Sequence, residues 1–583
     1  MADTPSEISS IDTLGSEASL ASSVLDEGED ERGSEDQPRD LTNATVDFTK
    51  IEEPRTVEEL QALIHRADKV SVYSKSRGFA TIADTSGTLV SLDDMAWDES
   101  SLQLDQQKRR VACSAFMSCA ALAKWLEDRG WALNNLPSSL NLSVGDAIAT
   151  AAHGSGDGCS MLTTSVVAVD YVDADGCLVA TTETDLASSS LGSATDPALQ
   201  AVLLGGLGVL VEVTLRIEPS FLIRQDVYLN LSWAPFWKEA PTFTGTGNVI
   251  TLAYMDEAAL IDDIFCEAYS VSAFIGDWCS DYISQAWFKR KVPWTPDGRM
   301  GALPSAAPEL FGGRLARSSV HPMKDAPASA CTLQGEPAGP SSTRLPHFES
   351  STQGDDAQLR SEYFVPREHA VDALRALRKI AIIIQGVLKV TELRTVAADE
   401  FWMSPHYRRP SFAIQFVWDC NVKTALKTLL HIENALKPFA PRPSWDSLFI
   451  SFGPEIPSAF AKSEKYRVLL ASLDPKGKFR SQYIDRFVFG NHRPGQGPLP
   501  PGSPGSPNSA QAISYGNAVR GVPRPYDLLR RPPRIGGVAE DPPAADADAA
   551  IQAVRQRNKV RIENGRLGWK FGLPQENGTD GYP

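Results

Sequence analysis

Two residues of opposite charge stand two positions apart in a segment that is predicted to be a β-strand. Glu392 and Arg394 occur in the run VTELRTV, where alternate side chains leave the same face of a sheet and Leu393 points to the opposite layer. A carboxylate and a guanidinium on one face can together hold and polarise an alcohol. The pair is therefore a candidate substrate site, and a structural ion pair is the alternative interpretation.

Two segments rich in glycine and other small residues are candidate ligand-binding loops. They run from Ser74 to Asp84 (SKSRGFATIAD) and from Leu136 to Gly156 (LPSSLNLSVGDAIATAAHGSG), and each follows a short apolar strand. Small residues let the backbone approach a phosphate, and the amides of a loop that opens a helix supply hydrogen-bond donors. Neither segment contains the Rossmann fingerprint, and either one alone is more typical of a plain turn.

The elements before these loops determine where the loops lie. Thr56 and Glu59 form a capping box at the start of a predicted helix, which is followed by a strand at Val70 to Tyr73 and then by the first loop. A second unit repeats this order: the strand RVACSAF precedes a helix that begins at Ser118 and ends at Gly130, and the chain then enters the second loop.

The rest of the chain predicts an α+β protein with two folded domains. A hairpin (VVAVDYV, DADG, CLVA) and the strand VLVEVTLRI complete a first domain at residues 44–220, and a second α+β domain occupies 221–490. Residues 294–356 are rich in Pro, Gly, Ser and Ala, so we expect a flexible insertion that forms a surface loop. An acidic tail at 1–43 and a Pro-rich tail at 491–583 are predicted to be disordered.

Composition excludes several classes of partner. The 583 residues carry a formal net charge of -17, so we expect no binding to nucleic acid or to an anionic membrane surface. The eight cysteines are scattered without zinc-ligand spacing, which favours a reducing compartment and no metal site. The amino terminus lacks the features of a signal peptide, and no run predicts a membrane span. We expect a cytoplasmic monomer.

Several segments in a fixed order resemble one family of flavoproteins. Besides the two loops, they are GGLGVLVEVTLRIEP (Gly205 to Pro219), SEYFVPREHA (Ser361 to Ala370), ELRTVAADEFWMSPHY (Glu392 to Tyr407) and LDPKGKF (Leu473 to Phe479). Together with the loops they resemble the vanillyl-alcohol oxidase superfamily, in its branch of sugar-alcohol (alditol, xylitol) oxidases and D-arabinono-1,4-lactone oxidases. The resemblance covers roughly residues 44 to 490.

The resemblance implies both a fold and an activity. The fold is a two-part PCMH-type FAD-binding domain followed by a substrate (cap) domain with a large antiparallel sheet. The activity is oxidation of the CH–OH group of a polyol or aldonolactone by hydride transfer to FAD, with dioxygen as the acceptor and hydrogen peroxide as the product. A degenerate flavin-binding scaffold with weak or no activity is the alternative.

The resemblance also assigns residues. The implied catalytic residues are Glu392, Arg394 and Ser138, and the implied substrate-binding residues are these three with Gln415 and Ser447. The implied cofactor-binding residues are Ser74, Lys75, Ser76, Arg77, Gly78, Phe79, Ser138, Ser143, Ala147, Ile148, Ala149, Thr150, His153, Gly154, Gly208 and Val209.

This sequence departs from the family pattern at several of these positions. Arg77 replaces the histidine that carries the covalent flavin, and a guanidinium cannot form that bond, so we expect FAD to be held non-covalently. Asp146 replaces a glycine, and we expect it to point away from the cofactor as a helix cap. Gln415, Val417 and Ser447 replace a histidine, a threonine and a lysine, which indicates a different range of substrates.

Overall fold

The computed structural model describes residues 50–73, 87–181 without 96, 98 and 139, 197–233, 257–293, 301–348, 359–450 and 455–489. The two predicted tails and the first ligand loop, with the predicted cofactor-binding residues 74–79, lie outside the described residues.

The N-terminal domain begins with the predicted helix and strand. Helix α2 (Val57–Arg66) starts after Thr56, whose hydroxyl accepts a hydrogen bond from the amide of Glu59 at 3.2 Å. It leads to β2 (Val70–Tyr73), which belongs to a parallel sheet of order β1-β3-β2 with β1 (Lys50–Glu52) and β3 (Thr88–Ser91). The capping box and the strand are confirmed.

A five-stranded antiparallel sheet forms the second part of this domain. Its order is β4-β5-β9-β7-β8, with β4 at Gln103–Asp105, β5 at Arg110–Ser114, β7 at Val166–Val172, β8 at Leu178–Ala180 and β9 at Val209–Arg216. The predicted hairpin is β7 and β8, and the predicted helix is α3 (Cys119–Glu127), capped by the hydroxyl of Ser118. The short helix α4 (Val144–Ala149) follows in the second loop.

The second domain, the cap, is built on a ten-stranded sheet of order β14-β15-β11-β13-β12-β18-β19-β17-β20, with β16 paired to β11. The strands are β11 (Leu222–Ser232), β12 (Ser270–Ile275), β13 (Tyr282–Lys291), β14 (Glu309–Leu310), β15 (Gly313–Leu315), β16 (Gly335–Pro340), β17 (Arg360–Pro366), β18 (Leu388–Val396), β19 (Ser411–Trp418) and β20 (Arg442–Pro443). All its strand pairs are antiparallel, which confirms the predicted large antiparallel sheet.

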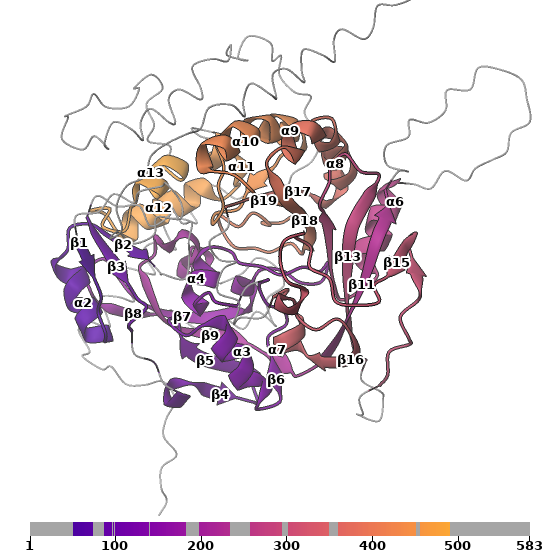
Figure 1. Ribbon diagram of the computed structural model, residues 1–583. Coiled ribbons are helices and arrows are strands. Elements are labelled where there is room, and N and C mark those ends of the chain that lie inside the picture. Colours follow the sequence, from indigo (N-terminus) through magenta and orange to yellow (C-terminus); the bar gives the residue numbers. More distant parts are fainter. Residues whose placement is uncertain are drawn as a thin grey trace, which may run out of the picture.

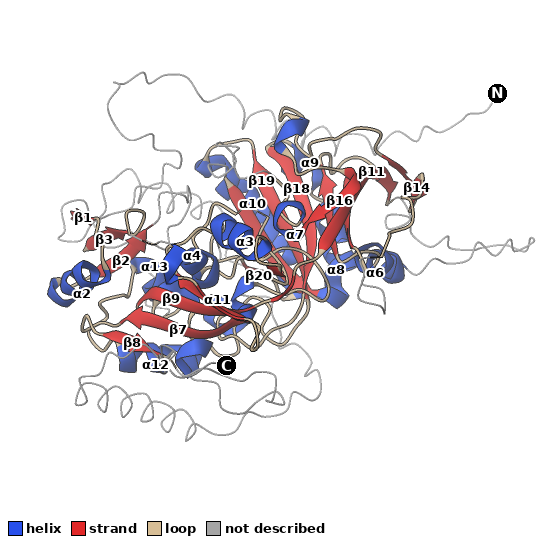
Figure 2. Cartoon of the chain, turned by 90° about the horizontal axis from the view of Figure 1, so that it is seen from below, coloured by secondary structure: helices blue, strands red, loops and turns tan. Residues whose placement is uncertain are grey.

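Four helices cover one face of this sheet, α6 (Glu257–Cys266), α8 (Ala370–Arg378), α9 (Ala381–Gln385) and α10 (Val422–Leu436) (Figure 1). Leu393 of β18 and Ile414 of β19 are fully buried in the core that these helices share with the sheet. The helices are amphipathic, so their apolar stripes supply the other half of that core. Figure 2 shows α2 at one end of the molecule and β14 at the other.

The segment 301–348 corrects a prediction, because the expected surface loop is an ordered part of the cap. It contributes β14, β15, β16 and helix α7 (Ser341–Arg344), and β16 pairs with β11. Cys331 and Phe348 pack against Phe274, Val390 and Val417 on the sheet face that the four helices leave open. Periodicity did not reveal this packing because the strands are short and rich in Pro and Gly.

The last helices, α11 (Glu455–Ala459), α12 (Ser463–Leu473) and α13 (Gln482–Phe487), lead the chain back to the N-terminal domain (Figure 1). The amide of Val70 donates to the carbonyl of Lys478 at 2.9 Å, and the Lys478 ammonium donates to the carbonyl of Ile64 at 2.6 Å. The Tyr466 hydroxyl bonds the carbonyl of Leu203 at 2.7 Å. The C-terminal part of the predicted cap therefore packs on the N-terminal domain.

Candidate active site

Three neighbouring strands of the cap place polar side chains in one row. Glu362 of β17 lies opposite Gln415 of β19, and Gln415 lies opposite Glu392 of β18. Directly paired residues of antiparallel strands point to the same face, so these three side chains lie side by side on the face away from the helices. Arg394 follows Glu392 by two positions and shares that face.

Arg394 joins this row to the second ligand loop. Its Nη2 donates to Oε1 of Glu362 at 2.5 Å and to Oε1 of Gln415 at 2.6 Å, and its Nη1 donates to Oγ of Ser138 at 3.0 Å. Its Nε lies 3.6 Å from Oε1 of Glu392. The structure thus brings together four of the predicted site residues, Ser138, Glu392, Arg394 and Gln415, and adds Glu362.

The end of the second loop is bonded to β18, which fixes the two domains against each other at the site. The amide of Gly156 donates to the carbonyl of Thr395 at 2.9 Å, and the amide of Ala397 donates to the carbonyl of Cys159 at 2.9 Å. Gly156 has φ +142°, and a Cβ there would lie 2.6 Å from the carbonyl oxygen of Tyr269. Only glycine fits this conformation and this close approach.

Both carboxylates of the row are buried, yet the surrounding cations keep them ionised. Burial alone raises the pKa of Glu392, but Arg394 and the hydrogen bonds from His347 and Ser272 outweigh burial and lower it. Burial likewise raises the pKa of Glu362, and Arg394 and His153 lower it to about 2. At neutral pH the site therefore holds two carboxylates around one guanidinium.

Sequence analysis missed three residues of this buried cluster, Glu362, His347 and Lys289. The Nε2 of His347 lies 2.6 Å from Oε1 of Glu392, and its Nδ1 lies 3.1 Å from Nζ of Lys289. Glu362 lies in the quoted motif SEYFVPREHA, so a signal was available. His347 lies in the segment that was expected to be a surface loop, and Lys289 had no motif around it.

His153 of the second loop is buried, and it contacts the other carboxylate of the row. Its Nε2 lies 3.4 Å from Glu362, and its Nδ1 lies 2.8 Å from the carbonyl oxygen of Gly154. Gly154 itself leaves no room for a side chain, since a Cβ would lie 2.5 Å from the carbonyl oxygen of Leu136. The entrance and the exit of the second loop therefore pack directly on each other.

The predicted cofactor-binding residues of α4 are largely occupied by bonds within the protein. Ser143 caps the helix, and its hydroxyl accepts from the amide of Asp146 at 3.0 Å. The amides of Val144 and Gly145 donate to carbonyls of residues 117 and 115, each at 2.8 Å. The side chains of Ala147 and Ile148 are fully buried in the core, and the Thr150 hydroxyl bonds the carbonyl of residue 146 at 2.8 Å.

Asp146 does not cap the helix, which corrects the expectation for this residue. It lies in the first turn of α4, where the helix dipole favours a carboxylate, and Ser143 performs the capping. Its Oδ2 is buried and has no hydrogen-bond partner among the described residues.

The remaining predicted positions form no hydrogen bond with the row in the described part of the chain. Gly208 has φ +144° and precedes Val209, which is buried in the core around α2. Ala149 is half-buried in the last turn of α4. The Ser447 hydroxyl donates to the neighbouring Asp446 at 3.4 Å, and the charge of Asp446 acts on Arg394. These cofactor and substrate assignments stay predictions.

One donor at the junction of the two domains, Nε of Arg394, has an ion-pair contact with Glu392 but no hydrogen bond among the described residues. Arg394 is 3% exposed. A buried guanidinium donor without a hydrogen-bond partner is costly, so this position fits a bound molecule that brings an acceptor. Together with the Ser138 hydroxyl from the small-residue loop, it suits the place where a flavin and an alcohol would meet.

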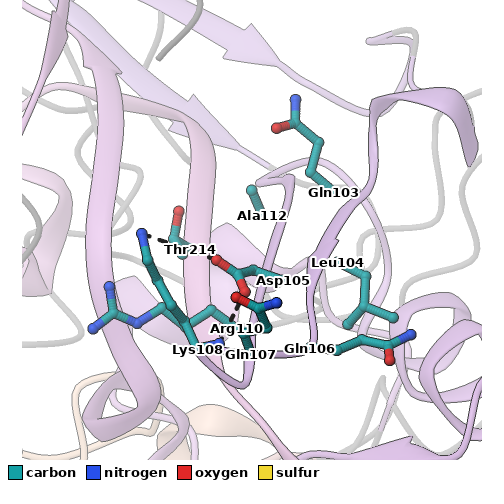
Figure 3. Close-up of a pocket in the computed structure, with 9 residues that line it drawn as sticks. All are labelled: Gln103, Leu104, Asp105, Gln106, Gln107, Lys108, Arg110, Ala112 and Thr214. Atoms are coloured by element: carbon teal, nitrogen blue, oxygen red, sulfur yellow. Dashed lines mark hydrogen bonds and ion pairs between the residues drawn. The ribbon is translucent and has the colours of Figure 1, made fainter. Parts of the chain in front are cut away.

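A separate hollow on the surface contains none of these residues. It has a volume of about 550 Å³ and is lined by Gln103, Leu104, Asp105, Gln106, Gln107, Lys108, Arg110, Ala112 and Thr214 (Figure 3). It lies along the β4–β5 hairpin at the edge of the five-stranded sheet, and Asp105 caps the turn by accepting from the amide of Lys108 at 2.9 Å. Most of the side chains that line it are polar, as expected for a hairpin that is exposed to solvent.

Two family matches and a similar enzyme give the class of the protein, a flavin-dependent oxidoreductase. Residues 49–182 match the family described as FAD binding domain, and residues 354–487 match the family D-arabinono-1,4-lactone oxidase. An alditol oxidase of a Streptomyces species is 31% identical over 452 residues, which cover 77% of this chain and 98% of that protein. The chain belongs to the family of FAD-binding oxidases that comprises the alditol oxidases and the aldonolactone oxidases.

More distant similarities agree with this family. L-gulonolactone oxidase of Mus musculus is 22% identical over 468 residues, covering 74% of this chain and 93% of that protein. The solved structure of a solvent-stable cholesterol oxidase has the same fold, with a TM-score of 0.53 at 16% identity over 75% of this chain and 95% of its own. The predicted PCMH-type fold is thereby confirmed. Within the described ranges, every helix is too short or too polar to cross a lipid bilayer.

Proposed function

We propose that this protein oxidises the CH–OH group of a polyol or an aldonolactone, with FAD as hydride acceptor and dioxygen as the final acceptor, which yields hydrogen peroxide. The observation that carries the proposal is the contact between Arg394 of the cap and Ser138 of the FAD-binding domain at 3.0 Å, beside the buried carboxylate of Glu392. This contact supports the proposal because it brings a carboxylate and a guanidinium to the junction of the two domains.

The chemistry follows from the charges of these groups. FAD bound at this junction would supply the hydride acceptor for the carbon of an alcohol, and the hydroxyl of that alcohol must release its proton. Glu392 is ionised, so it accepts the hydroxyl hydrogen bond and then the proton. Arg394 supplies a fixed positive charge beside the oxygen as negative charge develops there, and burial of the pair strengthens this attraction.

Gln415 and Ser447 adapt the site to its own substrate. The Gln415 carbonyl accepts from Arg394 at 2.6 Å, so its amide nitrogen is turned toward other partners and is available to a substrate hydroxyl. Serine at position 447 offers a hydrogen bond without the charge or length of the lysine expected there. A neutral polyol or lactone suits such a site better than an anionic sugar acid.

FAD is held without a covalent bond, because Arg77 stands where the linking histidine is expected. The first test is the absorption spectrum of the purified protein before and after acid precipitation. Flavin that moves wholly to the supernatant supports the proposal, and flavin that stays in the pellet contradicts it. A protein that is colourless and fails to bind added FAD would favour the degenerate scaffold.

The second test is turnover. Wild-type protein is screened with polyols and aldonolactones for peroxide release, and Glu392→Gln is expected to lose activity while it keeps its flavin. Glu464→Gln is the matched control, since that side chain is 71% exposed and far along the chain in α12. Equal activity of wild type and Glu392→Gln on every oxidised substrate would remove Glu392 from the mechanism.

A further inference from the structure

The buried polar row continues beyond Glu392 into the cap, through residues that the proposed function does not use. His347 bonds Glu392 at 2.6 Å on one side and Lys289 at 3.1 Å on the other. Lys289 is 1% exposed and His347 is 2% exposed. A lysine buried this deeply needs a reason, because its ammonium loses hydration that only hydrogen bonds can replace.

Lys289 is surrounded by acceptors. Its Nζ donates to the carbonyl oxygens of Leu345 and Pro346, the latter at 2.9 Å, and to Nδ1 of His347. These three acceptors match the three N–H groups of an ammonium. The two carbonyls immediately precede His347, so one stretch of chain holds both the lysine and the histidine.

The ring of His347 is neutral, so only one of its two nitrogens carries a proton. Which nitrogen carries it determines whether His347 can donate to Glu392. Burial, followed by the charge of Lys289, lowers the pKa of His347 to about 4. A neutral imidazole has one N–H, and its position is set by what the other nitrogen accepts. Lys289 donates to Nδ1 and the ionised Glu392 carboxylate can only accept, so the proton must lie on Nε2, where it points to Glu392. The Ser272 hydroxyl lies 3.0 Å from the same nitrogen.

Few charged or titratable groups among the described residues surround Lys289, His347 and Glu392. Lys289 faces Glu392 and the buried thiol of Cys331 as well as His347, and burial lowers its pKa to about 7 against the pull of these groups. Glu392 faces Arg394 and, beyond it, Glu362. Arg394 holds Glu392 from its own strand, while His347 and Lys289 hold it from two other parts of the cap.

We propose that Lys289 and His347 are positioning residues that fix the Nε2–H tautomer of His347 and thereby hold the Glu392 carboxylate ionised and oriented toward the substrate. The tautomer belongs to the folded protein itself, whereas its consequence for turnover rests on the function proposed above. Neither residue touches the reacting atoms, and both act through Glu392.

The tautomer can be tested without any turnover. In protein labelled with ¹⁵N at its eight histidines, the ring signals of His347, assigned by their loss in His347→Gln, are expected to show Nε2–H. In Lys289→Met they are expected to shift toward the other tautomer or a mixture. Lys291→Met is the matched control on the same strand, where the lysine instead pairs with Glu218 at 3.1 Å. An Nδ1–H ring in wild type, or no change in Lys289→Met, overturns the proposal.

The consequence for catalysis is tested by the pH profile of kcat/KM. Lys289→Met is expected to move the acid limb of the profile to higher pH by about one unit. In this variant the His347 ring no longer keeps its proton on Nε2, so the ionised form of Glu392 loses a hydrogen bond. In a His347→Gln background the same change should have little effect, since a glutamine amide donates without a tautomer. An equal shift in both backgrounds would contradict action through His347.

A second variant at position 289 and the histidine spectra keep the tests of Lys289 separate from the test of the proposed function. Lys289→Gln retains two N–H donors for the carbonyls of Leu345 and Pro346 and replaces the methionine variant if that variant does not fold. If wild type oxidises no polyol or lactone, the proposed function fails, while the histidine spectra still decide the role of Lys289.

Discussion

The buried polar row has two ends, one at Glu362 and one at Glu392. Both ends start with a carboxylate that contacts a histidine, but the residues beyond the histidines differ. Around Arg394, each carboxylate meets a histidine, Glu362 with His153 and Glu392 with His347. His153 comes from the second ligand loop of the FAD-binding domain, whereas His347 comes from the cap. The same chemical pair is therefore built twice, once from each domain.

Beyond the histidines the two ends differ. His153 packs edge-on against His406 and Phe364, at ring-centroid distances of 5.6 Å and 5.2 Å, so that end is closed by rings. The other end continues to the titratable Lys289. We therefore expect the His153 end to fix the domains against each other and the Lys289 end to respond to pH above 7.

Removing the guanidinium of Arg394, which both carboxylates share, should lower the free energy of unfolding more than any other change. Arg394→Met leaves Glu362 and Glu392 buried without their common cation, and the loss of one partner from a buried ion pair costs about 3–5 kcal/mol. Urea unfolding is expected to show this decrease in the free energy of unfolding. Adding Glu362→Gln should recover part of it, because one uncompensated charge disappears.

The matched control for this prediction is a surface arginine. Arg408 is 53% exposed and pairs with Glu400 at 2.9 Å, so Arg408→Met should change stability by less than about 1 kcal/mol. If the two arginine variants lose the same stability, the row around Arg394 is not the buried ionic centre described here.

Substitution of the two carboxylates should lower kcat to different extents. Glu392→Gln is expected to lower kcat by at least about 100-fold, the usual loss when a general base is removed. Glu362→Gln should lower kcat less, since its carboxylate faces His153 and supports Arg394 from the side away from Glu392. Flavin content, measured by absorbance, should remain equal in both variants. A larger loss in Glu362→Gln would reverse the assignment of roles.

Above pH 7 the Lys289 end should make the stability of the folded protein depend on pH. The pKa of Lys289 is about 7 in the folded protein, below the usual value of 10.5, so the unfolded chain binds more protons between these values. Stability from this group therefore rises with pH through that window, by up to about 1.4 kcal/mol per pH unit, and is lost as pH falls through 7.

The measurement compares wild type with Lys289→Met by urea unfolding at pH 7, 8 and 9. The free energy of wild type minus that of the variant is expected to increase with pH. Lys291→Met should follow wild type at all three values. A difference that stays constant with pH would mean that Lys289 keeps an ordinary pKa in the folded state.

The same comparison explains how much of the site could be predicted from the sequence. Glu392 and Arg394 were found because strand periodicity places residues two apart on one face, and this information is local. The loop with Ser138 was found through its small residues. Lys289 and His347 are 58 positions apart and meet only through the pairing of strands and the packing of 301–348, so no local pattern contains their contact.

The fold was predictable for a related reason. Capping at Thr56 and Ser118 and the apolar runs of β7 and β9 are short-range signals, and the structure confirms both caps and both strands. The error at 301–348 arose because Pro and Gly were taken as signs of a loop, although short edge strands tolerate them. The strand β16 lies on such an edge position, paired to β11 alone.

The smallest effect is expected at the closed end, where His406 offers the sharpest contrast with His347. His406 is fully buried, and neither ring nitrogen has a hydrogen-bond partner among the described residues. Burial, with the nearby cations, holds its pKa well below the usual range, so the ring is neutral. It packs edge-on against Phe364 at 4.5 Å, as a phenyl ring would.

His406→Phe should therefore leave stability unchanged or raise it by up to about 1 kcal/mol, because it removes two unsatisfied polar atoms and keeps the ring contacts. His347→Phe is the opposed control, since it takes a donor from Glu392 and an acceptor from Lys289, and it should cost at least about 2 kcal/mol. Thermal unfolding of both variants at pH 7 makes the comparison. Equal losses would show that His406 bonds a group in the folded holoprotein, and the closed end would then be a second polar contact of the site rather than a packed one.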